Sequence, residues 1–569
     1  MKSRRMRMSE YPKYRAPQPI EIENRVWPTR RIRSMPLCVP VDLRDGNQAF
    51  AKPMNVETKI RYFEMLCRIG FREIEVAYPA SSGEEFEFVR RLIGEGLIPD
   101  GVRINVLTAA RKDLIDRTVA SLAGVRQATV HCYIATSELH REFVFGKTSG
   151  EIMQTAVDGT RMIAEAVDAA GMRDRIRYEF SPEEFSDSEV GAIVELAEAV
   201  REAWKPRGKR DFVLNLPATV ERRPPYEFAD MIESFCRSYT GRNETTLSVH
   251  THNDQGCAVA AAEMAVLAGA DRVEGTLAGH GERTGNMDLI TFILNLKSRG
   301  VEPGLDFSKL PEIAAFIEEV SEIGIHPRAP YTGGLVFTAF SGTHQDAIRK
   351  GMAQRKEIGE RFRQGWKMPY LHIDPADVGR NYDGLIRINS QSGKGGVAYV
   401  LESVYGISVP KGMQPLVAKA VQAEAEATGS EITPSEVYRI FREKVAARNG
   451  RVTVAGFRLQ RPAPGAADKT EVDLELEAGG ERFSVSGTGG GPIEAAAAAF
   501  HDCGAVPPFQ VEMYSEHAIG RGAGAEAAAF IGIRPSGSDR IVYGAGIDVN
   551  INLAAIHAIA NAINHIGDN

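Results

Sequence analysis

The 569-residue chain is too long for a single ordinary hydrophobic core, so we expect several domains. A composition of 43% hydrophobic and 25% charged residues is typical of a globular protein, and a net charge of -7 argues against a nucleic-acid partner. With no apolar run of about 18 residues and no signal-peptide core behind its basic start, the sequence predicts a cytoplasmic protein with no membrane partner.

Between residues 36 and 305, short β-rich runs alternate with helical patterns. The runs lie at 38–43, 71–79, 102–109, 127–135, 175–180, 212–218, 247–253 and 272–278. Between them, apolar residues recur at intervals of three and four, as in VETKIRYFEMLCRIG. Eight strands alternating with helices over about 250 residues predict a (β/α)8 TIM barrel. An open doubly wound sheet is the alternative, but no GxGxxG follows the first strand.

Three further parts are predicted outside the barrel. Residues 1–35 form an N-terminal extension, and residues 306–445 form helical accessory subdomains. Residues 446–569 twice show a strand, a Gly-rich turn and an Ala-rich helix, in SVSGTGGGPIEAAAAAF and in IVYGAGIDVNINLAAIHAIANAI. This repeat predicts a small α/β domain with internal pseudo-symmetry.

Polar residues stand at the ends of nearly all the predicted barrel strands. Active sites of TIM barrels lie at the carboxyl ends of the strands. In chain order those positions hold Arg44, Asp45, Gln48, His131, Ser181, Glu183, Asn215, Thr219, His250, His252, Glu282 and Asn286. Charged and polar groups placed by chance would not sort in this way, so we expect the site there.

Four of these residues suggest a metal site. In SVHTHND, His250 and His252 lie two positions apart and therefore point to the same face of the seventh strand. With the carboxylate of Asp45 and the amide oxygen of Asn286, they make a mixed oxygen and nitrogen set that suits Zn²⁺, Mn²⁺ or Mg²⁺. Taken alone, the histidines could be polar residues at a strand end and Asp45 a turn residue. Their coincidence at one end of the barrel favours a divalent cation.

Other features have a structural interpretation beside a functional one. Six cysteines without a CxxC pair are typical of free thiols in a reducing compartment. GTGGGPIE lacks the Lys-Ser/Thr ending of a P-loop, which favours a small anion or carboxylate at the following helix over a nucleotide. His344, in SGTHQD, and Tyr370, in MPYLH, are structural residues unless they fold over the barrel mouth, where His344 becomes a general-base candidate.

Several motifs together resemble a known family. DLRDGNQ, LNLPATVE, SVHTHND and GHGERTGNMD, in this order and spacing, closely resemble the metal-dependent barrels that include 2-isopropylmalate synthase, homocitrate synthase and hydroxymethylglutaryl-CoA lyase. FSGTHQDAIRKG, PYLHIDPADVGR and NSQSGKGGVAYVLE narrow the resemblance to the long form of the 2-isopropylmalate synthase family. The resemblance covers nearly the whole chain.

The resemblance implies a Claisen-type condensation. Acetyl-CoA, 3-methyl-2-oxobutanoate and water would give (2S)-2-isopropylmalate and CoA, the first committed step of leucine biosynthesis. It implies that Asp45, His250 and His252 hold the cation, with Asn286 near it, and that Arg44 donates to the developing oxyanion. The implied oxo-acid residues are Gln48, His131, Ser181, Asn215 and Thr219. The implied candidate for the base is His344, together with Glu282 or Glu183, and Tyr370 is a secondary candidate near the site.

The resemblance also implies a homodimer with leucine as allosteric inhibitor, bound by residues 446–569. The expected regulatory positions are Gly487, Gly489, Gly491, Pro492 and Asp548. Gly490 stands where the family pattern often has Asn. Homocitrate or citramalate synthase, which use other 2-oxo acids, is the alternative activity. Retro-aldol cleavage of an acyl-CoA and a non-catalytic amino-acid sensor are the alternatives of another class.

Overall fold

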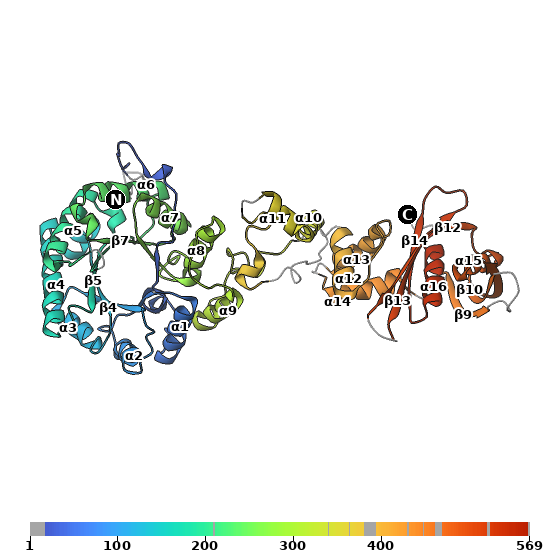
Figure 1. Ribbon diagram of the computed structural model, residues 1–569, viewed down its shortest axis with the longest axis horizontal. Coiled ribbons are helices and arrows are strands. Elements are labelled where there is room, and N and C mark those ends of the chain that lie inside the picture. The colour runs from blue at the N-terminus through green and yellow to red at the C-terminus, as the bar shows by residue number, and fades with distance from the viewer. Residues whose placement is uncertain are drawn as a thin grey trace, which may run out of the picture. The chain divides into compact units, whose positions relative to one another are not determined.

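The computed structural model describes residues 18–208, 211–339, 341–362, 365–380, 394–428, 432–447, 449–460, 469–520 and 524–566. These residues form two compact units, shown in Figure 1. The first extends to Val336 and includes Ile373–Arg380, and the second comprises Phe337–His372 and the chain from residue 394 onward. The predicted domain boundaries at 305 and 445 stay predictions.

The first unit is a barrel of eight parallel strands with helices on the outside (Figure 1). The hydrogen-bonded order is β1-β8-β7-β6-β5-β4-β3-β2, and β1 also lies next to β2. The strands are β1 Leu37–Pro40, β2 Glu73–Ala77, β3 Arg103–Ala109, β4 Ala128–Ala135, β5 Ile176–Glu183, β6 Phe212–Ala218, β7 Thr246–Thr251 and β8 Arg272–Gly275. All eight predicted strands are present, so the predicted TIM barrel is confirmed.

The outer helices alternate with the strands along the chain. They are α1 Val56–Ile69, α2 Gly83–Gly94, α3 Lys112–Ser121, α4 Ser149–Ala169, α5 Val190–Trp204, α6 Pro225–Ser238, α7 Ala258–Ala268 and α8 Leu289–Ser298, followed by α9 Leu310–Ser321. Local sequence sets their ends. For example, the Asn55 side chain accepts the N–H of Thr58 before α1, and Gly70 ends α1 with a left-handed φ of 112°.

The second unit contains helices and two antiparallel sheets. Its helices are α10 Gly342–Ala353, α11 Arg355–Phe362, α12 Lys394–Tyr405, α13 Gln414–Thr428, α14 Pro434–Ile440, α15 Pro492–Asp502 and α16 Ile551–Asn564. One sheet has the order β11-β10-β9, from β9 Val452–Gln460, β10 Thr470–Ala478 and β11 Glu481–Gly489. The other is β12-β13-β14, from β12 Phe509–Ile519, β13 Glu526–Pro535 and β14 Val542–Asp548. Each sheet is followed by one Ala-rich helix, as the repeated sequence plan predicts.

The β12–β14 sheet is covered on both faces. Along β13, Ala527, Ala529 and Ile531 pack in one core with α15 and α16, whereas Ala528 and Phe530 pack in another with α12, α13 and α14. This alternation follows from the two-residue period of a strand. It explains why the middle of β13 is apolar at every position.

Glycines in the last strand of each sheet let the following helix approach closely. A Cβ on Gly487 of β11 would lie 2.2 Å from the carbonyl oxygen of Ala495 in α15. In the second sheet, a Cβ on Gly546 of β14 would lie 2.1 Å from the carbonyl oxygen of Ala554 in α16. Gly489 is crowded in the same way. Small residues on both partners therefore define the strand–helix packing of each repeat.

The thiols of the chain are free, and several are buried. Burial raises the pKa of Cys38 on β1 and of Cys132 on β4 to about 12, and it raises that of Cys67 on α1 to the same value. In the part of the chain that the structure describes, no helix combines the length and apolarity that a membrane span requires.

Candidate active site

A cavity of about 320 Å³ lies at the carboxyl ends of the barrel strands. Eleven of the twelve residues predicted from the strand ends line it: Arg44, Asp45, Gln48, His131, Ser181, Glu183, Asn215, Thr219, His250, His252 and Glu282. The twelfth, Asn286, is buried and bonded to Asp45. The topology therefore brings residues from six strand ends to one cavity.

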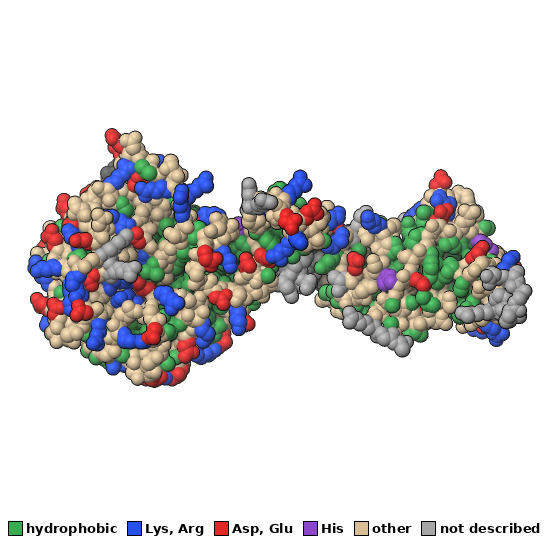
Figure 2. Space-filling view, in the orientation of Figure 1, with side chains coloured by type: hydrophobic (Ala, Val, Ile, Leu, Met, Phe, Trp, Pro, Cys, Tyr) green, Lys and Arg blue, Asp and Glu red, His purple; other side chains and the backbone are tan. Residues whose placement is uncertain are grey.

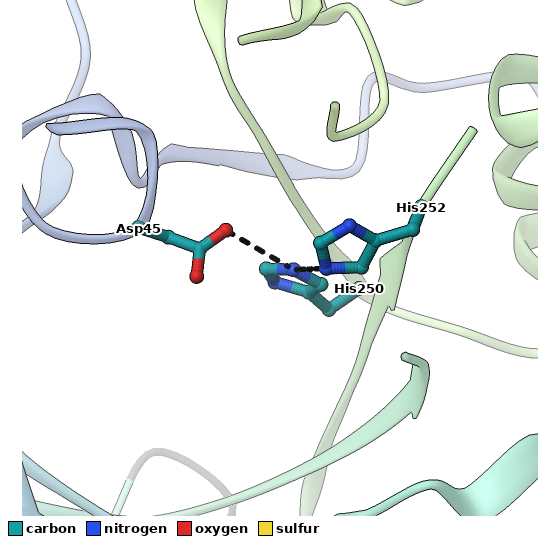
Figure 3. Close-up of side chains that lie close together, drawn as sticks. All are labelled: Asp45, His250 and His252. Atoms are coloured by element: carbon teal, nitrogen blue, oxygen red, sulfur yellow. Dashed lines mark hydrogen bonds and ion pairs between the residues drawn. The ribbon is translucent and has the colours of Figure 1, made fainter. Parts of the chain in front are cut away.

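Asp45, His250 and His252 bring their possible ligand atoms together in this cavity. These atoms all lie within 4.8 Å of one another, and the three residues are buried (Figure 3). The two Nε2 atoms are 3.2 Å apart, and Nε2 of His250 is 3.9 Å from Oδ2 of Asp45. Two nitrogens bound to one zinc ion at about 2.0 Å would lie roughly 3 Å apart. The donor types and their spacing therefore fit a divalent cation.

A short π-helical turn, Asp42–Gly46, presents Asp45 directly after β1. Asp42 anchors this turn, because its Oδ1 accepts the N–H of Leu277 at 2.9 Å and the hydroxyl of Tyr62 at 2.8 Å. Burial raises the pKa of Asp42 to about 7. The turn is thereby fixed between the segment after β8 and helix α1.

Arg44 binds Asp45 and Glu75 at once. Its Nη1 donates to Oδ1 of Asp45 at 2.7 Å, and its Nε donates to Oε1 of Glu75 at 2.5 Å. Burial raises the pKa of Asp45, but the charges of Arg44, His250 and His252 outweigh it and bring that pKa to about 2. Asp45 is therefore an anionic ligand candidate throughout the physiological pH range.

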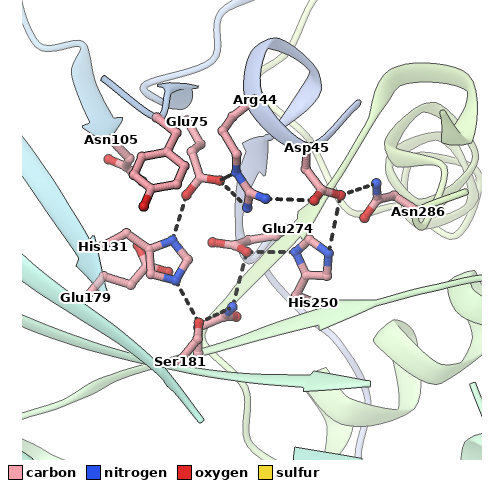
Figure 4. A network of polar contacts seen from close by, with 12 residues as sticks. Arg44, Asp45, Glu75, Asn105, His131, Glu179, Ser181, His250, Glu274 and Asn286 are labelled. Atoms are coloured by element: carbon pink, nitrogen blue, oxygen red, sulfur yellow. Dashed lines mark hydrogen bonds and ion pairs between the residues drawn. The ribbon is translucent and has the colours of Figure 1, made fainter. Parts of the chain in front are cut away.

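Glu274 of β8 holds His250 from the side opposite the cation position (Figure 4). Its Oε2 lies 2.9 Å from Nδ1 of His250, and its Oε1 accepts Nη1 of Arg272 at 2.7 Å. Asn215 also donates to Glu274, at 3.2 Å. A hydrogen on Nδ1 leaves the lone pair of His250 on Nε2, the atom that faces Asp45 and His252.

His252 is a neutral ligand candidate for a different reason. Burial and then the charge of His250 lower the pKa of His252 to about 3. Its Nδ1 is buried and has no hydrogen-bond partner among the described residues. The two histidines therefore differ, since a carboxylate orients only His250.

Both ring nitrogens of His131 are engaged with the protein. Its Nδ1 lies 2.7 Å from Oε2 of Glu75, and its Nε2 lies 2.7 Å from Oγ of Ser181 (Figure 4). Asn215 donates to the same Ser181 oxygen at 3.0 Å. His131 lines the cavity, and in this arrangement it holds Ser181; its predicted contact with an oxo acid stays a prediction.

The barrel interior holds an excess of buried acid. The network contains five carboxylates, Asp45, Glu73, Glu75, Glu179 and Glu274, and three guanidinium groups, Arg44, Arg177 and Arg272. The excess of two negative charges among these residues matches one divalent cation. Without a cation, protons can compensate. Burial raises the pKa of Glu179 to about 7. Burial lowers the pKa values of His131 and His250, but Glu179 and Glu75 beside His131, and Glu274 and Asp45 beside His250, raise them overall.

Asn286 supports Asp45 through its amide nitrogen. Its Nδ2 donates to Oδ2 of Asp45 at 2.6 Å and to the carbonyl of His280 at 2.9 Å. Its buried Oδ1 has no hydrogen-bond partner among the described residues. In this orientation the amide oxygen does not face Asp45, and half a turn of the amide would bring it there. The ligand role of Asn286 stays a prediction.

Besides Glu274, two carboxylates of the cavity are outside the ligand group. Glu183, at the end of β5, is half-buried, and burial and then the charge of Glu184 raise its pKa. A raised pKa makes a carboxylate a stronger base. Glu282 is exposed at the edge of the cavity.

The remaining candidates belong to the second unit. The rings of His344 and Tyr370 stack with centroids 3.9 Å apart and planes at 22°. Both residues are exposed, and Tyr370 has a left-handed φ of 58°. Their role as a base stays a prediction. Most of NSQSGKGG (389–396) lies outside the described residues.

The predicted regulatory residues lie at the strand–helix turns of the two repeats. Gly491 and Pro492 begin α15, and Asp548 ends β14, where its Oδ1 accepts the N–H of Asn550 at 2.8 Å. Gly487 and Gly489 are required by the close approach of α15. Leucine binding by this set stays a prediction.

Sequence reasoning missed several residues that line the cavity: Tyr78, Leu107, Tyr133, Pro217, Glu274 and Arg283. Glu274 is the register partner of His250 in the β7–β8 pairing. Aligning the two predicted strands would have placed it beside that histidine. Leu107 and Tyr133 could have been found from the alternation of inward positions along β3 and β4.

Comparison with known proteins supports this organisation. Residues 36–317 match the HMGL-like family, 334–402 the post-catalytic domain-like region of alpha-isopropylmalate synthase, and 431–567 the LeuA allosteric (dimerisation) domain. The 2-isopropylmalate synthase of Cupriavidus taiwanensis is 47% identical, over 97% of this chain and 94% of that protein. The chain belongs to the 2-isopropylmalate synthase family.

Two other members of the family are similar over nearly their whole length. The 2-isopropylmalate synthase of Ralstonia nicotianae is 45% identical, over 97% of this chain and 94% of that protein. That of Rhodospirillum rubrum is 44% identical, over 98% of this chain and 99% of that protein. The family membership that the motifs predict is thus confirmed.

Proposed function

We propose that the chain catalyses the 2-isopropylmalate synthase reaction. Acetyl-CoA, 3-methyl-2-oxobutanoate and water give (2S)-2-isopropylmalate and CoA, the first committed step of leucine biosynthesis. Relatives of this name match nearly the full chain. The observation that carries the proposal is the ligand group Asp45, His250 and His252 inside a cavity at the strand ends.

These three residues would hold Mg²⁺, Mn²⁺ or Zn²⁺. When bound, the cation would supply Lewis-acid polarisation of the keto group of the oxo acid. Arg44 is fixed beside Asp45 by two carboxylates, so its positive charge stabilises the negative charge that develops on the keto oxygen. Thr219 accepts the N–H of Glu184 at 2.9 Å, which leaves its hydroxyl hydrogen to donate to the carboxylate of the oxo acid.

Glu183 is the proposed base that removes a proton from the acetyl methyl group. The resulting carbanion forms a carbon–carbon bond with the keto carbon of the oxo acid, and the keto oxygen takes up a proton. Water then cleaves the thioester and releases the thiol of CoA. Glu282, and the stacked pair His344 and Tyr370, are further candidates for the proton transfers.

The lining of the cavity favours a branched apolar oxo acid. Leu107 and Pro217, with Tyr78 and Tyr133, provide surface for an isopropyl group. The lining cations that the structure describes are already paired: Arg44 with Asp45 and Glu75, and Arg283 with Asp254. The distal carboxylate of 2-oxoglutarate would have to compete for these partners. This supports 3-methyl-2-oxobutanoate over the homocitrate synthase substrate.

A panel of 2-oxo acids tests the proposed function. Purified protein, acetyl-CoA and a divalent cation are mixed with 3-methyl-2-oxobutanoate, pyruvate or 2-oxoglutarate, and released CoA is measured. We expect the highest kcat/KM with 3-methyl-2-oxobutanoate and no release after a chelator. Faster turnover of pyruvate or 2-oxoglutarate would refute the assignment and favour citramalate or homocitrate synthase.

Leucine inhibition, a homodimer and a cytoplasmic location complete the proposal. The LeuA allosteric (dimerisation) domain matches the C-terminal segment. In Figure 2, hydrophobic side chains gather over the part of the second unit that carries β13, β14 and α16, where Val549 and Ile551 are exposed. An exposed apolar surface of this kind suits a second copy of the chain. Light scattering tests the homodimer, and the oxo-acid assay repeated with leucine tests the inhibition.

A further inference from the structure

Glu184, the residue after the proposed base Glu183, has a left-handed backbone conformation. Its φ is 59° and its ψ is 35°. Side chains other than glycine disfavour this region, so the surrounding structure must hold Glu184 there. Its carboxylate is also buried, with 6% of the side chain exposed. Backbone strain and a buried charge thus coincide at one position beside the cavity.

Contacts from neighbouring elements hold Glu184 in this conformation. Its N–H donates to Oγ1 of Thr219 at 2.9 Å, and its carbonyl accepts the hydroxyl of Ser188 at 2.9 Å. Its Oε2 accepts the hydroxyl of Ser137 and lies 2.5 Å from Nδ1 of His140. Ser137 and His140 follow β4, and Thr219 follows β6. Glu184 therefore joins the ends of three adjacent strands.

Ser137, His140 and Glu184 do not have the geometry of a nucleophilic triad. In a triad, histidine uses one ring nitrogen for the acid and the other for the serine. Here the Nδ1 atom of His140 lies near both partners, 3.5 Å from Oγ of Ser137. Ser137 and His140 also contact the same carboxylate oxygen. Ser137 and His140 instead hold the carboxylate of Glu184 in place, and we call these two residues the clamp.

Glu183 and Thr219, which adjoin Glu184, both have a role in the proposed reaction. Glu183 precedes Glu184 in the chain, Thr219 accepts its N–H, and both line the cavity. We propose that Glu184 is a positioning residue. The clamp keeps the backbone of Glu184 left-handed. This conformation places Glu183 where it can abstract the proton, and it places Thr219 where it can bind the carboxylate of the oxo acid. This inference rests on the proposed function.

Two substitutions separate the backbone effect from the loss of the carboxylate. Glu184→Ala and Glu184→Gly lack the same side-chain contacts, but only glycine adopts the left-handed conformation readily. We expect kcat to fall about tenfold in both, and the KM for 3-methyl-2-oxobutanoate to be about tenfold higher in Glu184→Ala than in Glu184→Gly. A purely structural role would lower the stability of Glu184→Ala more than that of Glu184→Gly, but it would leave the two KM values of the folded protein equal.

Glu322 provides a matched control. It is also a glutamate with a left-handed φ, 55°, but it lies exposed at the end of α9. Glu322→Ala and Glu322→Gly should leave both kinetic constants unchanged. Equal KM values for Glu184→Ala and Glu184→Gly would overturn the inference. A wild-type protein without oxo-acid-dependent CoA release would instead refute the proposed function.

A second set of variants tests the same inference if Glu184→Ala does not fold. Ser137→Ala removes one arm of the clamp and should raise the same KM severalfold. Adding Ser137→Ala to Glu184→Gly should cause no further rise, because the clamp then has no carboxylate to hold. An additive effect of the two substitutions would count against a role through Glu184.

Discussion

Single side chains decide the chemistry of the cation site. The Nε2 atoms of His250 and His252 face each other at 3.2 Å, and Glu274 occupies the other nitrogen of His250. Glu274 is itself fixed by Arg272 and Asn215. A carboxylate held in this way fixes the tautomer of a histidine ligand and raises its basicity.

Glu274→Gln should weaken cation binding without unfolding the barrel. The amide keeps the shape of the side chain but removes the charge that supports His250, so we expect a loss of about 10- to 100-fold in affinity. Competition with a chelating dye measures the affinity directly. Glu198→Gln, which alters a carboxylate bound to Arg201 and Thr240, is the control and should bind the cation normally. Unchanged affinity in Glu274→Gln would contradict the orienting role.

The sequence pattern predicted the ligand candidates, but it did not predict the residues and turns that position them. An HxH pair and an aspartate at strand ends are visible in sequence because strand periodicity is regular. The π-helical turn that presents Asp45 and the left-handed Glu184 are not visible, because each depends on contacts from distant segments. Asp42, for instance, binds Leu277 at the other end of the barrel sequence.

Among whole elements, the predicted strands are right in number and order but differ at their ends. The sequence predicts that the first strand reaches residue 43, but β1 ends at Pro40, and the turn Asp42–Gly46 follows it. The eighth was expected to reach 278, yet β8 ends at Gly275. A Cβ there would lie 2.4 Å from the carbonyl of Met287, since the segment after β8 folds back onto the strand. Tertiary contacts, which local sequence does not reveal, set both ends.

Glycine positions under α15 and α16 should be sensitive to one added methyl group. Gly487→Ala and Gly546→Ala would force each helix away from its strand, and overpacking of this kind costs about 2 kcal/mol of unfolding free energy. Gly524→Ala, at an exposed position before β13, is the control, because no atom lies within 4 Å of a Cβ there. Chemical denaturation of the three variants measures the difference. Equal stability would mean that the repeats tolerate a wider strand–helix spacing.

Glu73 links the interior faces of four barrel strands. It accepts hydrogen bonds from Asn105 on β3 and Arg177 on β5, and it pairs with Arg272 of β8 at 3.0 Å. Burial raises the pKa of Glu73, but Arg272 and Arg177 outweigh it and lower that pKa from 4.5 to about 2. Because the folded-state pKa lies below the unfolded value, Glu73 stabilises the barrel above pH 4.5, and this stabilisation is lost as the pH falls towards 2.

Glu73→Gln should therefore destabilise the barrel at pH 7 and flatten its response to acid. The expected loss is about 3 kcal/mol at pH 7, shrinking below pH 4 as the wild-type carboxylate takes up a proton. Urea unfolding at a series of pH values measures it. Glu95→Gln, at an exposed pair with Arg91, should follow the wild-type profile. A loss that stays constant from pH 7 to pH 3 would exclude the ionised carboxylate as its source.

The described residues form two units. The barrel unit buries apolar residues of its own, and the second unit contains two further buried cores. Among the residues that the structure describes, the cation candidates and the excess of buried acid lie in the barrel unit. A ligand that binds one folded unit stabilises that unit and not the other. This separation makes the thermal behaviour of the protein informative about the site.

Calorimetry should show two unfolding transitions, of which only one responds to a divalent cation. At a concentration of about 100 times its Kd, the cation should stabilise the barrel by about 2.7 kcal/mol. His252→Ala should abolish the shift while leaving the other transition in place. A shift of both transitions, or of neither, would contradict a cation site confined to the barrel.

The buried thiols have a consequence for oxidative damage. Peroxides attack the thiolate form of cysteine. Cys38 and Cys132, on the strands that carry the site, have a pKa near 12 and stay protonated in the folded protein. These two thiols are therefore protected from oxidants as long as the barrel stays folded.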